Sequence, residues 1–547
     1  KPVALERPIE IDPYVNRLLI ALYAPVVRGV LRFRKTTIAL AVLALILTYP
    51  AFARLGSEFM PPLNEGMIFY MPTTLPGISV TQASRLLQMQ DRMLKTFPEV
   101  QWVFGKAGRA ETSTDPAPFS MGETIVMLKR ESEWRAGMTW EKLVDDMDKK
   151  IRLPGVANAW TMPIKNRIDM LSTGIRTPVG IKIFGPDLTK IEEIGRHLEI
   201  VLNSVPGTRS VFAERVAGGY YLDFDLKREE IARYGLMIED IQMIIETAIG
   251  GESITTTVEG RERYPVSVRY ARELRDDPEK LKRVLIPTSN GAQVPLGQLT
   301  ELRLASGPAM IRDEDAQLAG YVLVDMAGRD IGSYVDEAKR KVAEQVTLPA
   351  GYTLSWSGQY EFIQRAKEKL MYVVPLTLLI IFILLYINLR SAAKCGIVLL
   401  AIPFSMIGAI WLVYLLGYNM SVAVWVGIIA LAGVDAETGV IMLLYLDQAY
   451  DKWRSSGRME TVKHLQEAIT EGAVKRIRPK MMTVMAILVG LLPIMWSHGA
   501  GADVMKRIAA PMIGGVVSSF LLELMVYPAI YHVWRGRALR RETGDSI

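Results

Sequence analysis

The stretch "IIALAGVDAETGVIMLLYLDQA", residues 428–449, decides the fold class, because it is typical of a membrane-spanning helix that has acidic residues in its middle. The sequence has no charge from Ser421 to Val434, and none again from Thr438 to Leu446. Asp435 and Glu437 lie between these two runs. A charged side chain at the bilayer centre costs roughly 2.5–3.5 kcal/mol on insertion scales. Since such residues commonly mark ion pathways, the two carboxylates indicate a function.

Apolar blocks of this kind recur along the 547-residue chain, half of which is hydrophobic although 22% of the residues are charged. Six uncharged segments have close to the roughly 20 residues that cross a bilayer, and we therefore predict an α+β membrane protein with six spanning helices. The blocks divide the chain into residues 1–35 as an interfacial amphipathic segment on the cytoplasmic side, 36–55 as the first span, 56–369 as an external domain, 370–534 as five further spans and 535–547 as a cytoplasmic tail.

The basic residues of the short loops set the orientation, because cytoplasmic loops carry an excess of Lys and Arg. If the spans simply alternate, nearly all the basic clusters fall on one side, with Lys506 and Arg507 as a mild exception. We therefore predict that residues 56–369 lie outside the cytoplasm. The single cysteine, Cys395, is at the cytoplasmic edge of a span, so the external domain has no disulfide. Because the chain begins at Lys1 with neither an initiator Met nor a signal peptide, we expect a piece of a longer protein.

The external region alternates strand-like and helix-like segments. "GMIFYMP" is typical of a strand, and the following "SVTQASRLLQMQDRMLKTF" has apolar residues at helical spacing, with Ser79 as a candidate helix cap. The cycle repeats from "PVGIKIFGPDLTKIEEIGRHLEIVLNSVPGTRSVFAE". This order predicts split βαβ units of the ferredoxin-like kind.

A large ectodomain between one span and five more, together with several long motifs, resembles the second half of a resistance–nodulation–division (RND) transporter. The motifs are "FMPPLNEGMIFYMPTTLPGIS", "NRIDMLSTGI", "RYGL", "IALAGVDAETGVIML", "RIRPKMMTV" and "RIAAPMIGG". They are similar to those of the heavy-metal efflux branch, and in particular of its copper/silver pumps. The resemblance implies spans seven to twelve of a twelve-span pump of the bacterial inner membrane, with a periplasmic porter and docking domain. It also implies a homotrimer with a periplasmic adaptor and an outer-membrane channel.

The intramembrane carboxylates receive roles from this resemblance. On a helix, Asp435 and Glu437 point about 200° apart and cannot face one path. The resemblance implies that Glu437 and Lys480 belong to a proton relay whose third member, an Asp, lies in the absent half. Burial disfavours a charged carboxylate and a nearby ammonium favours it, so such a cluster can load and release a proton. Asp435 departs from the family pattern and Glu523 has no assigned role, so both are taken as structural.

The 27 methionines are more numerous than usual, and in the spans they are interpreted as flexible core residues. In the ectodomain, Met71, Met121 and Met170 lie in family-like motifs, and the resemblance implies that their thioethers form one metal site. Thioethers select Cu(I) and similar soft ions over Zn(II), Co(II) and Ni(II). Glu123 is a possible neighbouring carboxylate, and Met505 a weaker candidate for a relay site. The chain has four His, which argues against an imidazole-rich zinc site.

These observations favour a proton-driven exporter of Cu(I) or Ag(I), a metal ion:proton antiporter rather than an enzyme, with no cofactor beyond the transported ion. One alternative is an RND exporter of Zn, Co, Ni or organic compounds. Another is a membrane metal-binding scaffold that does not transport, against which the presence of Glu437 and Lys480 argues. No G-x-x-x-x-G-K-[ST] nucleotide-binding loop occurs in the sequence. The expected partners are the N-terminal half of the pump and membrane lipid, with no nucleic acid.

Overall fold

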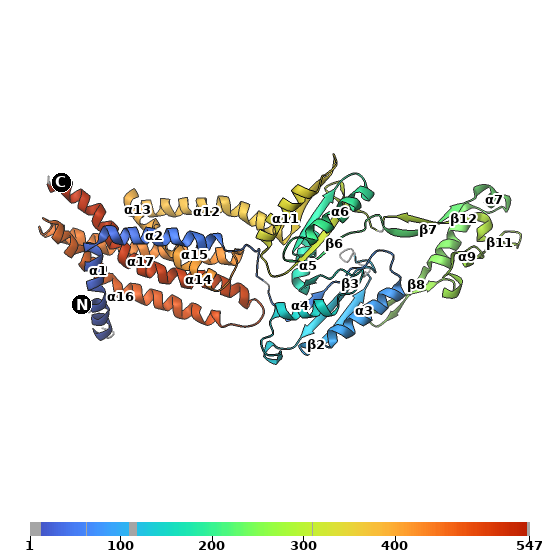
Figure 1. The fold of residues 1–547 in the computed structure, drawn as a ribbon, viewed down its shortest axis with the longest axis horizontal. Helices are drawn as coiled ribbons and strands as arrows, with labels where there is room; N and C mark the ends of the chain where they lie inside the picture. Colours follow the sequence, from blue (N-terminus) through green and yellow to red (C-terminus); the bar gives the residue numbers. More distant parts are fainter. Residues whose placement is uncertain (1–12, 62, 109–116, 309, 544–547) are drawn as a thin grey trace, which may run out of the picture.

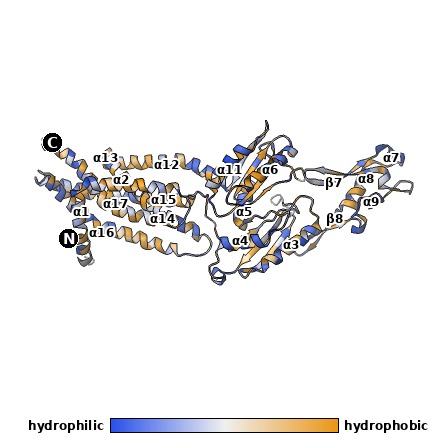
Figure 2. Ribbon diagram, in the orientation of Figure 1, coloured by the Kyte–Doolittle hydropathy of each residue, from blue (hydrophilic) through white to orange (hydrophobic). Residues whose placement is uncertain are grey.

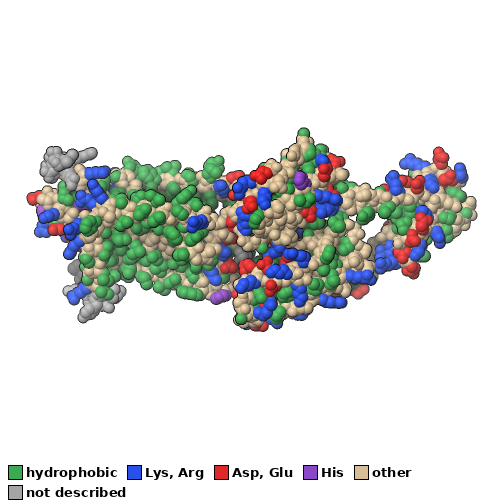
Figure 3. Space-filling model, viewed as in Figure 1, with side chains coloured by type: hydrophobic (Ala, Val, Ile, Leu, Met, Phe, Trp, Pro, Cys, Tyr) green, Lys and Arg blue, Asp and Glu red, His purple; other side chains and the backbone are tan. Residues whose placement is uncertain are grey.

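The computed structural model describes residues 13–61, 63–108, 117–308 and 310–543. A long helical bundle leads into two α/β lobes, and a narrow arm extends from these to a distal lobe (Figure 1). The bundle is apolar along its length and polar at both ends (Figure 2), and its surface shows a hydrophobic band between charged ends (Figure 3). This is the surface that a hydrocarbon layer stabilises.

Six helices of the described chain are long and apolar enough to cross a membrane, as predicted. They are α2 (Arg34–Ala53), α12 (Gln359–Leu389), the continuous pair α13 (Ala392–Leu399) and α14 (Ala401–Leu415), α15 (Val422–Ser455), α16 (Val462–Met495) and α17 (Ala502–Thr543). The predicted boundary at residue 369 falls inside α12, because the charged turns from Gln359 to Lys369 continue the same helix outside the apolar band.

The amphipathic segment forms helix α1 (Pro13–Arg32), and residues 1–12 lie outside the described chain. It runs across the end of the bundle (Figure 1). Its apolar side packs on α16 and α17 through Tyr23, Val27 and Leu31, and the Tyr23 hydroxyl donates to the Leu524 carbonyl oxygen at 2.7 Å. The helix therefore packs its apolar side on the bundle, and its place at the membrane surface stays a prediction.

The first α/β lobe has the element order β-α-β-β-α-β. It consists of β1 (Met67–Tyr70), α3 (Val80–Lys95), β2 (Val100–Ala107), β3 (Gly122–Leu128), α4 (Trp140–Lys150) and β4 (Trp160–Thr161). The sheet order is β2-β3-β1-β4, with every pairing antiparallel. Ser79 caps α3, as predicted, by accepting from the backbone N–H of Gln82. One core joins α3 and α4 to the sheet, with Leu94 and Leu143 fully buried.

The second lobe repeats this order. Helix α5 (Pro163–Thr173) leads into β5 (Val179–Phe184), α6 (Leu188–Asn203), β6 (Thr208–Ala213), β14 (Gln317–Met326), α11 (Ile331–Gln345) and β15 (Thr353–Gly358). Its strands lie in the order β6-β14-β5-β15, and β13 (Arg312–Glu314) adds to β14. The two lobes therefore share one topology, and the second carries an insertion between β6 and β14.

That insertion is the arm and the distal lobe. Strands β7 (Gly219–Leu226) and β12 (Thr300–Gly307) pair antiparallel along their whole length and form the arm. Beyond it lie α7 (Arg228–Arg233), α8 (Ile238–Ile244), the hairpin β8 (Glu252–Glu259) with β9 (Glu262–Val268), α9 (Pro278–Leu281), β10 (Leu285–Pro287), β11 (Gln293–Pro295) and α10 (Leu296–Leu299). A small separate core around Ile241 and Leu299 holds this lobe together.

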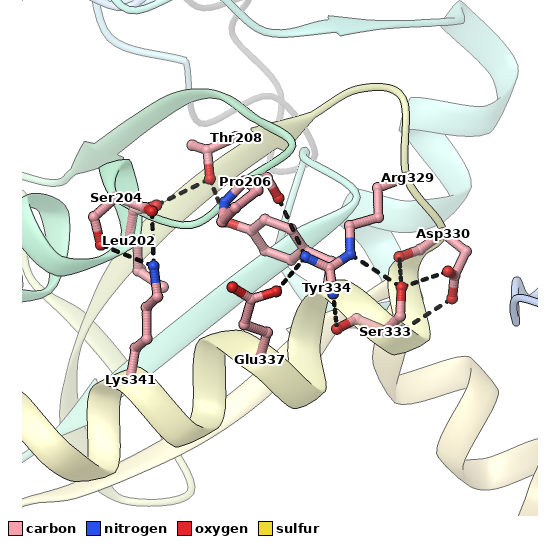
Figure 4. A network of polar contacts seen from close by, with 10 residues as sticks. All are labelled: Leu202, Ser204, Pro206, Thr208, Arg329, Asp330, Ser333, Tyr334, Glu337 and Lys341. Atoms are coloured by element: carbon pink, nitrogen blue, oxygen red, sulfur yellow. Dashed lines mark hydrogen bonds and ion pairs between the residues drawn. The ribbon is translucent and has the colours of Figure 1, made fainter.

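A network of polar contacts surrounds the start of α11 within the second lobe (Figure 4), and Asp330 extends it to the segment that leaves α2. Asp330 caps α11 by accepting from the N–H of Ser333 at 2.9 Å, and the same oxygen accepts from the N–H of Ser57 at 3.0 Å. Arg329 holds the first turns through an ion pair with Glu337 at 2.5 Å. The segment that leaves α2 is therefore fixed directly to a helix of the α/β region.

Candidate metal and proton sites

The structure brings the three predicted methionines into one apolar cluster. Met71 follows β1 and is fully buried, with its backbone N–H donating to the Ala159 carbonyl oxygen at 2.9 Å. Met121 stands just before β3, where its backbone bridges Thr73. Met170 projects from α5 and packs against the cluster that contains them, with its sulfur 3.1 Å from the side-chain nitrogen of Asn166. Three thioethers from three elements thus lie together, although about 50 residues separate each from the next in the sequence.

A cavity of about 390 Å³ between the two α/β lobes opens onto this cluster. Met121 and Met170 line it on one side, and Phe212 and Tyr321 belong to the second lobe. Met310 also lines the cavity, and sequence reasoning missed it. No motif marked Met310, which reaches the cavity only because the arm returns the chain to β14.

Arg176 is the principal charged group at the cluster, and it was not predicted. Gly174 ends α5 with φ +75°, and this turn directs Arg176 inward. One guanidinium nitrogen, Nη1, lies 2.8 Å from the Met121 sulfur, and Nη2 donates to the Thr73 hydroxyl at 2.7 Å. Burial lowers the pKa of Arg176 to about 10, so the side chain stays charged at neutral pH. A fixed positive charge therefore occupies one face of a predicted ligand.

The other charged side chains that line the cavity each have an ion-pair partner. Arg312 makes a two-point contact with Glu214 at 3.0 and 3.1 Å, and Arg215 pairs with Glu199 at 2.9 Å. The possible extra ligand Glu123 pairs with Lys106 of the adjacent strand at 2.8 Å. The structure therefore directs the Glu123 carboxylate toward a lysine rather than toward sulfur.

Two further observations concern the predicted ligands. Met505 lies in the first turn of α17, is 48% exposed, and belongs to no cluster with the other three methionines. In the part of the chain that the structure describes, no three or more His, Cys, Asp or Glu side chains form a group suited to a metal ion. Thioethers are therefore the ligands that the described ectodomain gathers in one place.

Inside the membrane bundle, Lys480 of α16 pairs with Glu523 of α17. The Nζ–Oε2 distance is 2.5 Å, and the two side chains are 3% and 1% exposed. No ion pair within 4 Å joins Lys480 to Glu437, the other residue assigned to the relay, among the described residues. The physical reason is helix geometry: Asp435 points into the bundle with Lys480, so Glu437, two positions on, points out and is exposed. Glu523, which the sequence left without an assigned role, is therefore the residue that pairs with the lysine.

Comparison with known proteins gives consistent matches over nearly the whole chain. The AcrB/AcrD/AcrF family profile matches residues 13–535. The cation efflux system protein SilA of Salmonella typhimurium is 46% identical over 533 residues, which are 97% of this chain and 51% of that protein. For CusA of Escherichia coli (strain K12) the identity is 44% over 526 residues, 96% of this chain and 50% of that protein.

A more distant relative and a crystal structure extend these matches. The cobalt-zinc-cadmium resistance protein CzcA of Cupriavidus metallidurans is 33% identical over 529 residues, 95% of this chain and 49% of that protein. A crystal structure of a heavy metal efflux pump matches with a TM-score of 0.84 at 29% identity, covering 95% of this chain and 52% of that chain. The chain thus spans about half the length of the curated relatives it matches.

Proposed function

The chain belongs to the AcrB/AcrD/AcrF family, in its heavy-metal RND branch, and we propose that it forms the C-terminal half of a proton-driven exporter of Cu(I) or Ag(I). With six apolar helices and a large soluble region, it is a multi-pass protein of the bacterial inner membrane. In this proposal both α/β lobes are split βαβ units of the ferredoxin-like kind in the periplasm. The complete pump is a homotrimer that works with a periplasmic adaptor and an outer-membrane channel.

The convergence of Met71, Met121 and Met170 is the observation that carries the choice of metal. Uncharged thioethers favour Cu(I) and Ag(I), whereas Zn(II), Co(II) and Ni(II) prefer imidazole and carboxylate. CzcA is the relative that supports the alternative substrates, at 33% identity against 46% for SilA and 44% for CusA. The methionine cluster therefore supports the proposal of a soft monovalent ion.

We expect metal resistance to require both halves of the pump. The chain would be expressed in a copper-sensitive strain that lacks its own exporter, alone and together with the N-terminal half of SilA. The chain alone should give no resistance, because the proposed relay needs an Asp from the other half, while the pair should restore growth on copper and silver. Full resistance from the chain alone, or resistance to zinc and cobalt instead, would contradict the proposal.

The positive charge of Arg176, whose Nη1 lies 2.8 Å from the Met121 sulfur, should weaken the binding of a metal cation there. The substitution Arg176→Gln removes the charge and keeps an amide that can bond Thr73. We expect Ag(I) to bind at least about tenfold more tightly, since a unit charge about 4 Å away can cost up to roughly 4 kcal/mol at an effective dielectric constant of about 20. Competition titration measures the change. Arg176→Lys, which keeps the charge, is the control; an equal gain in both variants would assign the effect to packing.

A further inference from the structure

The buried ion pair in the membrane bundle leaves Glu523 fully satisfied. Besides Lys480, its other oxygen accepts from the Ser519 hydroxyl at 2.9 Å and from the Thr438 hydroxyl at 3.0 Å, which shares its hydrogen with the Asp435 carbonyl oxygen at 3.2 Å. A carboxylate with these contacts, one of them to an ammonium, is stabilised in its ionised form. Glu523 is therefore the charged partner of Lys480.

Asp435 lies near this ion pair but, unlike Glu523, has no ion-pair partner within 4 Å among the described residues. Its side chain is 1% exposed, and its Oδ2 atom has no hydrogen-bond partner. It faces the hydroxyls of Ser405 and Ser519. Each hydroxyl has one hydrogen and a second acceptor within reach: the Ile402 carbonyl oxygen lies 2.9 Å from Ser405, and Glu523 lies 2.9 Å from Ser519. When the hydrogens point to those acceptors, the hydroxyls present lone pairs to Asp435, which only a protonated carboxyl group can use as a donor.

The surrounding charges lead to the same conclusion. Lys480 is bonded to Glu523, and Arg476, one helical turn away on α16, lies with its guanidinium carbon 5.9 Å from the centre of the Tyr445 ring. Arg476 interacts electrostatically with Glu523 and with the outward-facing Glu437, and the uncharged phenol of Tyr527 faces both inner acids. In the described part of the chain, no ion pair within 4 Å involves Asp435, and Lys480 acts on it only from a longer distance while bonded to Glu523. An ionised Asp435 would be a buried charge without a direct partner, which is strongly destabilising.

We propose that Asp435 and Glu523 share one proton through the Ser519 hydroxyl, forming a proton-binding site complete within this chain. The Asp435 carboxyl donates to the Ser519 oxygen, while Ser519 donates its own hydrogen to Glu523. Transfer moves one proton along each bond, leaving an Asp435 carboxylate, an unchanged serine and a neutral Glu523. Lys480 then shifts its ammonium from Glu523 to Asp435, and the net charge of the cluster does not change.

This site is distinct from Glu437, which faces outward from the same helix. The idea that this site couples proton flow to metal export rests on the proposed function, and metal-export assays test it. The idea that the site holds one proton does not rest on the proposed function, and spectroscopy without any metal tests it.

Infrared spectroscopy of the full chain in lipid nanodiscs tests the proton directly. All samples, the reference included, carry Glu437→Gln, which removes the other carboxyl group in the middle of α15; at neutral pH we then expect the carbonyl stretch of one buried, protonated carboxylic acid. Asp435→Asn should remove it, because the remaining Glu523 stays ionised beside Lys480. Glu523→Gln should remove it too, because the freed Lys480 then pairs with an ionised Asp435. Ser519→Ala should keep the band but shift it, through loss of a hydrogen bond.

Asp447→Asn is the matched control on the same helix. Asp447 is buried and paired with Lys394 at 2.6 Å and Arg535 at 3.0 Å, so it is ionised and its replacement should leave the band unchanged. Thermal melts of each variant identify any that fail to fold, and Asp435→Glu, which restores an acid, should restore the band. A reference spectrum without the band, or a band that survives Asp435→Asn or Glu523→Gln, overturns the shared proton.

Discussion

Replacing Met121 by Ile should weaken Ag(I) binding by the chain by more than the roughly 10–100-fold that loss of an outer-shell partner costs a metal site. Isoleucine keeps the volume and apolar character of the side chain and removes the sulfur. Such exchanges in a core usually cost under about 1.5 kcal/mol, so the fold should persist. Met71→Ile and Met170→Ile should behave alike, since all three pack in one cluster.

Double replacements should add little to the loss, because one remaining thioether hardly holds a monovalent ion. Titration of Ag(I) with parallel thermal melts separates binding from stability. Met147→Ile is the control: Met147 is fully buried in the neighbouring core of the first lobe, so it should lower the melting temperature comparably and leave affinity unchanged. Unchanged affinity in all three cluster variants would refute the thioether site.

Glu437→Gln should abolish metal export by the assembled pump while leaving metal binding intact. Glutamine keeps the size and hydrogen bonding of the side chain but cannot release a proton. Because Glu437 is exposed on the outside of α15, the substitution leaves the core of this bundle undisturbed. Lys480→Met should also stop export, and it additionally leaves Glu523 as an unpaired buried charge, so it should lower stability by about 3–5 kcal/mol as well.

Proteoliposomes with an imposed proton gradient provide the measurement, with export followed by loss of lumenal or appearance of external Ag(I). Glu437→Asp, which retains a titratable carboxyl, should keep part of the activity. Export by Glu437→Gln at the wild-type rate would remove this residue from the relay.

The sequence predicts local structure well where the deciding residues are close together. Charge-free runs mark six helices, and Ser79 caps α3 as predicted. The 200° separation of Asp435 and Glu437 is confirmed in that one is buried and the other exposed. The start of α12 at Gln359 was missed because its first turns carry charges, which a search for uncharged segments excludes.

Contacts between residues that are far apart in the sequence could not be predicted from local sequence patterns. Lys480 and Glu523 are 43 positions apart on different helices, and only the packing of α16 on α17 makes them partners. Arg176 and Met121 are 55 positions apart, and the turn at Gly174 decides that they meet. The resemblance supplied the three methionines, but it gave no signal for Met310 or for the insertion of the arm between β6 and β14.

Helix α17 joins two regions that otherwise have separate roles. Within the bundle it carries Glu523, and near its outer end Arg507 pairs with Glu58 at 3.1 Å. Glu58 follows Ser57, the residue that Asp330 fixes to α11. Arg507 and Glu523 are 16 residues apart on α17, which is about 24 Å along a helix. A rotation of α17 on proton transfer would therefore strain the contacts that fix Ser57 and Glu58 to the second lobe and to α17. Proton transfer inside the membrane would in this way act directly on the α/β region through one helix.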